Sequence, residues 1–286
     1  MFVTGLCFVA VTALVKYLGV GVPPAQSAFV RYLMGLVFLI PLIPALRQVQ
    51  LSQRLWVMFG ARGGVHAVGV GLWFFSMTRI PLAEVTAMNY LSPVFVTLGA
   101  AMFLGERLAA RRIAAVLVAL IGAVIILRPG FREVNAGHLS MLLAGLAFSA
   151  SFLLGKITTD ETTPEMVIAM LSLWVTVALA PFAMMDWVPI GWRELAILFT
   201  VALFATGGHY TMSLAFAAAP IAVTQPVTFL QLIWAVAVGV VVFGEAIDLF
   251  VILGGGLIMA AISFIAWREM VVSRRAITPP TPATKV

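Results

Sequence analysis

Two long apolar stretches of the chain carry polar residues at matching positions. Each stretch begins at a proline, Pro81 or Pro220, and closes on a Gly-Glu pair. Within each stretch, every third position across one helical ridge is polar: Thr86, Asn89 and Ser92 in the first copy, and Gln225, Thr228 and Gln231 in the second. Amides and hydroxyls of this kind bind a ligand through hydrogen bonds, or they bond to one another between packed helices. The sequence leaves both interpretations open.

Aromatic and histidine residues accompany the two polar rows. His66 and His209 precede the two prolines by fifteen and eleven residues, a difference of about one helical turn, so they are expected on related faces. An imidazole in an apolar segment is costly, which makes it a candidate for substrate binding or proton transfer; a histidine that is satisfied by packing is the alternative. The candidate substrate-binding residues added to the six polar ones are Tyr90, Trp234, His66, Trp73, His209 and Tyr210.

Four basic residues fall inside apolar segments. Lys16 and Lys156 lie 140 residues apart and occupy equivalent positions of an internal repeat. They are interpreted either as gating or anion-attracting residues, one for each face of the membrane, or as side chains that reach the interface. Arg31 and Arg62 have no basic counterpart, and they could anchor a carboxylate or extend to the lipid headgroups.

The acidic residues fall in loops or at segment ends, and none is expected at mid-depth. Proton-coupled transporters commonly use a buried carboxylate, so either a histidine performs that role or transport is facilitative. No GxxxxGK[ST] motif is present for ATP hydrolysis. The chain also lacks the clustered carboxylates or His/Asp sets that a membrane enzyme needs, and Cys7 with two isolated histidines makes a poor metal site. We therefore predict no catalytic residues, no metal and no cofactor.

Composition predicts an integral membrane protein. Of 286 residues, 63% are hydrophobic and 10% are charged, against about 45–50% and ~25% in average soluble domains. Proline, glycine and charge divide the chain into ten apolar segments: 2–18, 25–46, 55–78, 82–103, 112–128, 138–157, 164–185, 193–216, 221–243 and 248–267. The net charge of +6 comes largely from basic residues between these segments, which indicates topology rather than nucleic-acid binding. The expected partners are the lipid bilayer and a small-molecule substrate.

The two halves repeat one another. A shift of 139 residues aligns Pro81 with Pro220, and a shift of 140 aligns Lys16 with Lys156. Two five-helix repeats are predicted, at 1–130 and 138–268, followed by a disordered cytoplasmic tail at 269–286. Because five is odd, the second repeat must enter the membrane from the opposite side, giving inverted-topology repeats in an all-α fold. The greater number of Lys and Arg residues in one set of loops predicts both termini in the cytoplasm.

The duplicated segment resembles the drug/metabolite transporter superfamily, specifically ten-helix proteins made of two EamA-type domains. The resemblance rests on NYLSPVFVTLGAAMFLGERL (89–108), its echo TFLQLIWAVAVGVVVFGEAI (228–247) and the run IGAVIILRPG (121–130). In the second copy Leu232 replaces Pro93, so a proline kink at that position is not shared, and Pro226 could supply one elsewhere. The resemblance implies an inner-membrane exporter or exchanger of small polar metabolites, and it is greatest for YddG-type exporters of amino acids, aromatic ones included.

These observations together predict a secondary transporter that works by alternating access without ATP hydrolysis, as a functional monomer. Inverted repeats place a substrate site near the midplane where the halves face each other. The alternatives are an exporter of other small solutes (drugs, cations or nucleosides), a membrane-embedded enzyme, or a channel. A channel would favour a polar stripe through the whole bilayer, whereas the polar residues here are concentrated at mid-depth.

Overall fold

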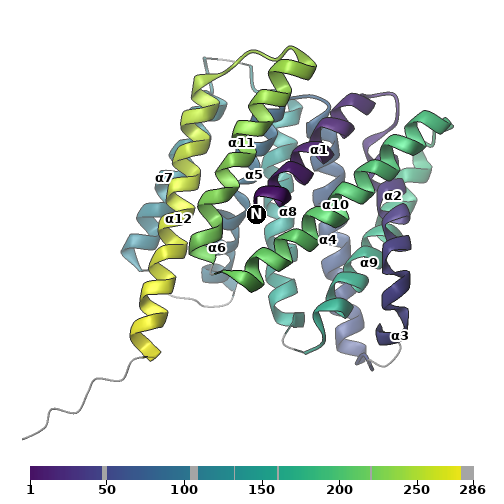
Figure 1. The fold of residues 1–286 in the computed structure, drawn as a ribbon, viewed down its shortest axis with the longest axis horizontal. Helices are drawn as coiled ribbons and strands as arrows, with labels where there is room; N and C mark the ends of the chain where they lie inside the picture. Colours follow the sequence, from purple (N-terminus) through teal and green to yellow (C-terminus); the bar gives the residue numbers. More distant parts are fainter. Residues whose placement is uncertain (47–49, 104–108, 132, 160, 220, 278–286) are drawn as a thin grey trace, which may run out of the picture.

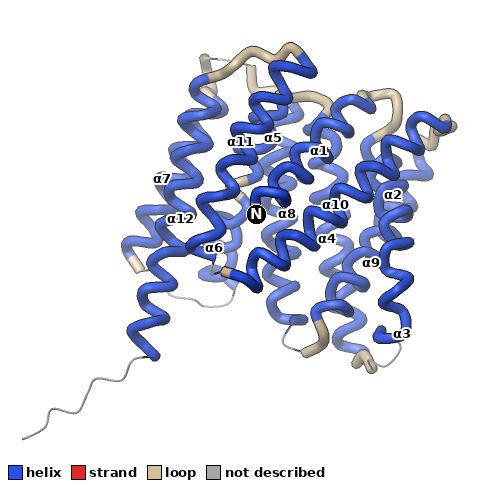
Figure 2. The backbone as a smooth tube through the Cα atoms, in the orientation of Figure 1, coloured by secondary structure: helices blue, strands red, loops and turns tan. Residues whose placement is uncertain are grey.

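The computed structural model describes residues 1–46, 50–103, 109–131, 133–159, 161–219 and 221–277. Every element in this part of the chain is a helix (Figure 2). The first half contains α1 (Phe2–Leu18), α2 (Pro24–Gly35), the 3-10 helix η1 (Leu36–Leu42), α3 (Ile43–Leu46), α4 (Gln53–Met77), α5 (Leu82–Asn89), α6 (Ser92–Phe103) and α7 (Ala110–Leu127). The second half contains α8 (Ala136–Thr159), α9 (Pro164–Met185), α10 (Trp192–Ala218), α11 (Ile221–Phe243) and α12 (Leu249–Ile277).

The helices follow the apolar segments of the sequence closely. Eight stretches of the described chain are long and apolar enough to cross a membrane, and Phe2–Leu18 and Val227–Phe243 form shorter apolar helices. Many large apolar side chains remain exposed on the outside of the bundle, as lipid contact requires, among them Phe103, Phe182 and Val241. The all-helical, multi-pass membrane architecture predicted from the sequence is confirmed.

The fourth apolar segment is not one continuous helix. α5 ends at Asn89, and α6 begins at Ser92, just before Pro93. Pro93 has no N–H to donate to the carbonyl of Asn89, and its ring clashes with the preceding turn, so the helix breaks there. α11, which has Leu232 at the corresponding position, runs unbroken from Ile221 to Phe243. The break at this position is confined to the first copy, as the replacement of Pro93 by Leu232 predicts.

The C-terminal prediction differs from the structure. The tail was predicted to be disordered from residue 269, but α12 continues as far as Ile277. Arg112 on α7 donates to the carboxylate of Glu269, which ties this extra length of helix to its neighbour. Residues 278–286 lie outside the described part of the chain.

The helices form one bundle with a core that draws on both halves. α7 and α12 lie side by side at one edge of the bundle, and α2, α4 and α9 lie towards the other (Figure 1). The two groups are joined through α1, α5, α8, α10 and α11, and buried residues such as Phe74, Met88 and Ile258 belong to one continuous apolar cluster. α7 and α12 cross tightly, because a Cβ on Gly254 would lie 2.5 Å from the carbonyl oxygen of Gly122.

The two ends of the bundle can be told apart by the helix termini they contain. At one end of the bundle α1, α4, α9 and α11 all terminate. We call it the Lys16 end, because Lys16 lies in the last turn of α1. α11 finishes there at Gly244, whose left-handed φ of 65° ends the helix and turns the chain towards α12. The other end, where α2, α8 and α12 finish, is the tail end.

Candidate functional site

The helix break between α5 and α6 brings part of the polar row against α11. Tyr90, at the break, donates its hydroxyl to the backbone carbonyl of Thr228, at 2.9 Å. Ser149 of α8 donates to the carbonyl of Ser92, at 2.8 Å, which holds α8 against the start of α6. The Tyr90 hydroxyl is therefore used in holding the halves together, and the residue is only 7% exposed.

The other members of the polar rows differ in their surroundings. Thr86 and Ser92 are buried, and the Ser92 hydroxyl has no hydrogen-bond partner among the described residues. Asn89 and Gln231 are half-buried, and Gln231 packs against Gly5 of α1. The hydroxyl of Thr228 points to the sulfur of Met259, at 3.5 Å. The side chain of Gln225 lies outside what the structure describes.

The two histidines occupy matching environments. His66 of α4 lies against the ring of Phe148 of α8, with ring centroids 5.0 Å apart, and its Nδ1 lies 3.1 Å from the Ser151 hydroxyl. His209 of α10 lies against the ring of Phe8 of α1, at 5.2 Å. Since Phe8 and Phe148 are 140 residues apart in the sequence, the same contact is made once by each half.

The three remaining aromatic candidates are not all in one place. Trp73 contacts Phe148 edge to face at 6.2 Å, and its Nε1 is buried without a hydrogen-bond partner. Trp234 packs edge to face on Phe2 of α1 and is 39% exposed. Tyr210 is 65% exposed, and no ring contact or hydrogen bond described here joins it to the other candidates. The structure therefore groups Trp73 with His66 and leaves Tyr210 apart.

Lys16 links α1 to two neighbouring segments at the Lys16 end of the bundle. Its Nζ lies 2.5 Å from a carboxylate oxygen of Glu245, which follows α11, and it also donates to the carbonyl of Ile80, at 2.8 Å. Glu245 accepts from the N–H of Leu82, at 3.0 Å, so it caps α5 and joins α1, α5 and α11 at one point. The side chain of Lys156 lies outside what the structure describes.

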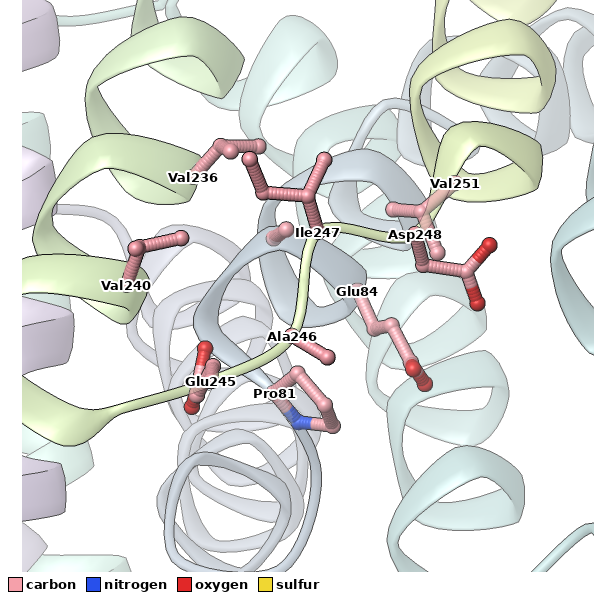
Figure 3. A pocket seen from close by; sticks show the side chains of 10 residues that line it. Pro81, Glu84, Val236, Val240, Glu245, Ala246, Ile247, Asp248 and Val251 are labelled. Atoms are coloured by element: carbon pink, nitrogen blue, oxygen red, sulfur yellow. The ribbon is translucent and has the colours of Figure 1, made fainter.

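A small hollow lies beside this link rather than at the polar rows. Figure 3 shows Pro81, Glu84 and Glu245 around it, together with Asp248 at the start of α12. Ala83 also lines it. Because the hollow opens between the end of α11 and the start of α5, it is a vestibule at the Lys16 end and not the mid-depth site that the sequence predicts.

Sequence reasoning missed one buried polar pair. His138, in the first turn of α8, lies 2.7 Å from Glu84 in the first turn of α5, and both side chains are almost fully buried. The N–H of Asn135 donates to Nδ1 of His138, so the imidazole presents its Nε2 proton to Glu84. Both residues lie near the ends of predicted apolar segments, where charge usually meets water, and their spacing in the sequence gives no signal that they meet.

No group of three or more His, Cys, Asp or Glu side chains in the described residues is arranged to hold a metal ion. The candidate chemistry of the interior is hydrogen bonding, aromatic contact and charge, which suits the binding of an organic solute.

Comparisons with known proteins identify transporters of organic solutes as relatives. The model of the EamA-like transporter family matches the chain twice, at residues 1–128 and 135–267. A riboflavin transporter of Rhizobium johnstonii is 31% identical over 94% of this chain and 90% of its own length. A pseudopaline exporter of Pseudomonas aeruginosa is 28% identical (89% and 90%), and an S-adenosylmethionine uptake transporter of Rickettsia prowazekii is 26% identical (89% and 86%). One crystal structure superimposes with a TM-score of 0.60 at 19% identity, covering 96% of this chain and 98% of the other, which supports the fold.

Proposed function

The chain belongs to the EamA-like transporter family and is a small-molecule transporter; from this premise we propose that it moves a small organic metabolite by alternating access. The observation that carries the proposal is the pair of matching histidine–phenylalanine contacts, His66 on Phe148 and His209 on Phe8. Each contact joins a helix of one half to a helix of the other. Two interchangeable contacts of this kind are what a carrier needs to open first to one side and then to the other.

The proposed architecture is ten membrane helices in two inverted five-helix repeats, 1–130 and 138–268. The separate family matches to each half support it. So does the exchange of contacts, because α4 packs on α8 as α10 packs on α1, and α4 packs on α9 as α10 packs on α2. We place both termini in the cytoplasm of a bacterial inner membrane, which puts the Lys16 end outside, and we propose that the monomer is functional.

The proposed substrate site lies between the α5–α6 break and α11, next to the two histidines. Broken helices in transporters expose backbone and side-chain polar groups at mid-depth, where a ligand can use them. Asn89 and Gln231 are half-buried and so are accessible to a ligand, whereas Tyr90 holds the α11 backbone. Asn89→Ala should reduce transport while the protein reaches the membrane in normal amounts; wild-type rates would remove Asn89 from the site.

Lys16 is proposed as a gate residue at the outer end. Its contact with Glu245 joins α1 to α11 and α5, elements that belong to different repeats. By the internal repeat, Lys156 is proposed to serve the inner end. The structure is consistent with a conformation whose outer end is closed.

The proposed substrates are amino acids, including aromatic ones, moved outward. The resemblance to amino-acid exporters and the rings of Trp73 and Trp234 support this choice. The similar proteins are named for riboflavin, pseudopaline and S-adenosylmethionine, and these three solutes are the alternative substrates. The absence of an ATP-binding motif from the sequence supports facilitative or ion-coupled transport.

The test is counterflow in proteoliposomes that contain the purified protein. Labelled amino acids, riboflavin, S-adenosylmethionine, nucleosides and sugars are presented outside, with unlabelled solute inside, with and without a pH gradient. The proposal expects saturable uptake that is stimulated by solute on the opposite side. Flux that does not saturate, or that shows no such stimulation, contradicts alternating access, and gradient-driven flux assigns coupling to His66 or His209.

A further inference from the structure

Two arginines are buried inside membrane-spanning helices, and neither has an acidic partner in the described part of the chain. Arg31 on α2 is 9% exposed and Arg62 on α4 is 8% exposed. The Nε and Nη1 atoms of Arg62 have no hydrogen-bond partner in the described residues, and the guanidinium of Arg31 lies over the ring of Tyr32, 4.0 Å from its centroid. Neither arginine forms a salt bridge with any carboxylate that the structure describes.

The position of Arg62 excludes an interfacial role. It is the tenth residue of the 25-residue helix α4, about 13 Å along the axis from the first residue at 1.5 Å per residue. A side chain that reaches for the headgroups leaves its guanidinium in water, whereas that of Arg62 is packed against α8. A Cβ at Gly155 would lie 2.9 Å from the central carbon of the guanidinium, so glycine at 155 makes room for it.

The arginines have two histidines and further N–H donors around them. His66 lies in the electrostatic field of Arg62, His209 and Arg31, and His209 in that of Arg31. Trp73 and Trp174 each bury an indole N–H that has no acceptor among the described residues. Trp174 of α9 packs directly on Gly63, the residue after Arg62. The region lined by α2, α4, α9 and α10 therefore combines the two guanidinium charges with unused N–H donors.

A charge that is buried without a partner is costly, and it persists where a ligand supplies the partner. We propose that Arg62, assisted by Arg31, binds an oxoanion, a carboxylate or phosphate group of the transported solute. The planar guanidinium matches both groups with two parallel N–H donors. The inference rests on the proposed transport function, and it narrows the substrate to solutes that carry such a group.

The test measures ligand binding to the purified full-length protein by tryptophan fluorescence and by thermal shift. Two matched pairs differ in their anionic group: succinate against succinamide, and phenylalanine against phenylalaninamide; inorganic phosphate is the third probe. Saturable binding of at least one of the three anions is expected; where succinate or phenylalanine binds, its amide should bind at least tenfold more weakly. Equal binding of an acid and its amide, or no anion binding at all, overturns the proposal.

Substitutions then assign the anion to the arginines. Arg62→Gln should weaken anion binding tenfold or more, and Arg62→Lys should recover part of it because the charge remains and the fork is lost. Gly155→Ala leaves both arginines in the sequence, but its new methyl group displaces the Arg62 guanidinium. It should therefore also weaken anion binding. Arg54→Gln, on the exposed start of the same helix, is the matched control and should bind as wild type. Wild-type binding by Arg62→Gln overturns the assignment.

Thermal stability without ligand separates a binding role from a structural one. Removing a buried unpaired charge should leave the melting temperature of Arg62→Gln unchanged or higher, whereas a fall with no loss of anion affinity in the surviving folded protein would show a structural role. Stabilisation by phosphatidylglycerol in nanodiscs, but by none of the soluble anions, would assign the arginines to a lipid headgroup and overturn the proposal. If only a neutral solute shows counterflow, the anion site is refuted and the transport proposal stands. If an anion binds but no solute shows counterflow, the transport proposal is refuted and the anion site stands.

Discussion

Breaking the Lys16–Glu245 contact should open the Lys16 end of the bundle. The two side chains are 19% and 13% exposed, so their bond is largely shielded from water. A hydrogen bond between charged groups contributes roughly 1.5–3 kcal/mol, and the remaining exposure places this one in the lower part of the range, at about 1.5–2 kcal/mol. If the contact exists only when this end is closed, its loss multiplies the open fraction about 10- to 30-fold, since about 1.4 kcal/mol is a factor of ten.

The assay follows a cysteine in the hollow next to Glu245. In a Cys7→Ala background, Ala83→Cys places a thiol on the lining of that hollow. Its rate of labelling by a membrane-impermeant maleimide reports how often this end is open. Lys16→Met keeps an apolar stem near the Phe243 ring but removes the charge, so labelling should accelerate about 10- to 30-fold.

Two further variants test the reasoning. Glu245→Gln keeps an acceptor for the N–H of Leu82 and should accelerate labelling less than Lys16→Met does. The double variant should be no faster than Lys16→Met alone, because both changes break one contact. Arg79 is an exposed cation at the same end, and its described hydrogen bonds stay within its own segment. Arg79→Met is therefore the control, and it should leave the labelling rate unchanged. Labelling of Lys16→Met that stays within about twofold of its parent would refute the gate, since it corresponds to under ~0.5 kcal/mol.

Three other outcomes follow from the packing. Gln231→Ala should impair counterflow with normal membrane expression, and a wild-type rate would exclude it from the substrate path. Gly254→Ala should destabilise the protein by about 1–3 kcal/mol, because the new methyl group meets the backbone of α7; Gly71→Ala, which has no neighbour within 4 Å, is the control in the same detergent-unfolding experiment. His138→Ala should cost about 3 kcal/mol by leaving Glu84 buried without this partner; an unchanged unfolding midpoint would contradict that estimate.

Local features of the fold followed directly from the residue order. The ten apolar segments appear as helices with nearly the predicted bounds, since burial in lipid requires a continuous apolar run whose backbone groups bond within the helix. Pro93 breaks the first copy of the repeated segment, and Leu232 leaves the second copy continuous. Only the C-terminal helix was misjudged, because its contact from Glu269 to Arg112 is made with a distant helix.

The candidate site was predictable in part. The sequence placed His66 and His209 on related faces, and the structure gives each a phenylalanine from the other half. Tyr90 was expected to face the ligand, but its hydroxyl is bonded to the α11 backbone. Glu245 closes the second of the two stretches in the sequence; in the structure it caps α5 and pairs with Lys16, two contacts with distant helices.

By itself, then, the sequence determined which segments enter the membrane, that the two halves repeat, and where proline or glycine ends a helix, because each depends on neighbouring residues alone. Only the tertiary structure decided which side chains meet. It gave Lys16 and His138 a carboxylate each, and among the described residues it gave Arg62 none. Apolar helices offer many similar faces to their neighbours, so a charge finds a partner, or lacks one, only once packing has fixed how every helix is rotated about its axis.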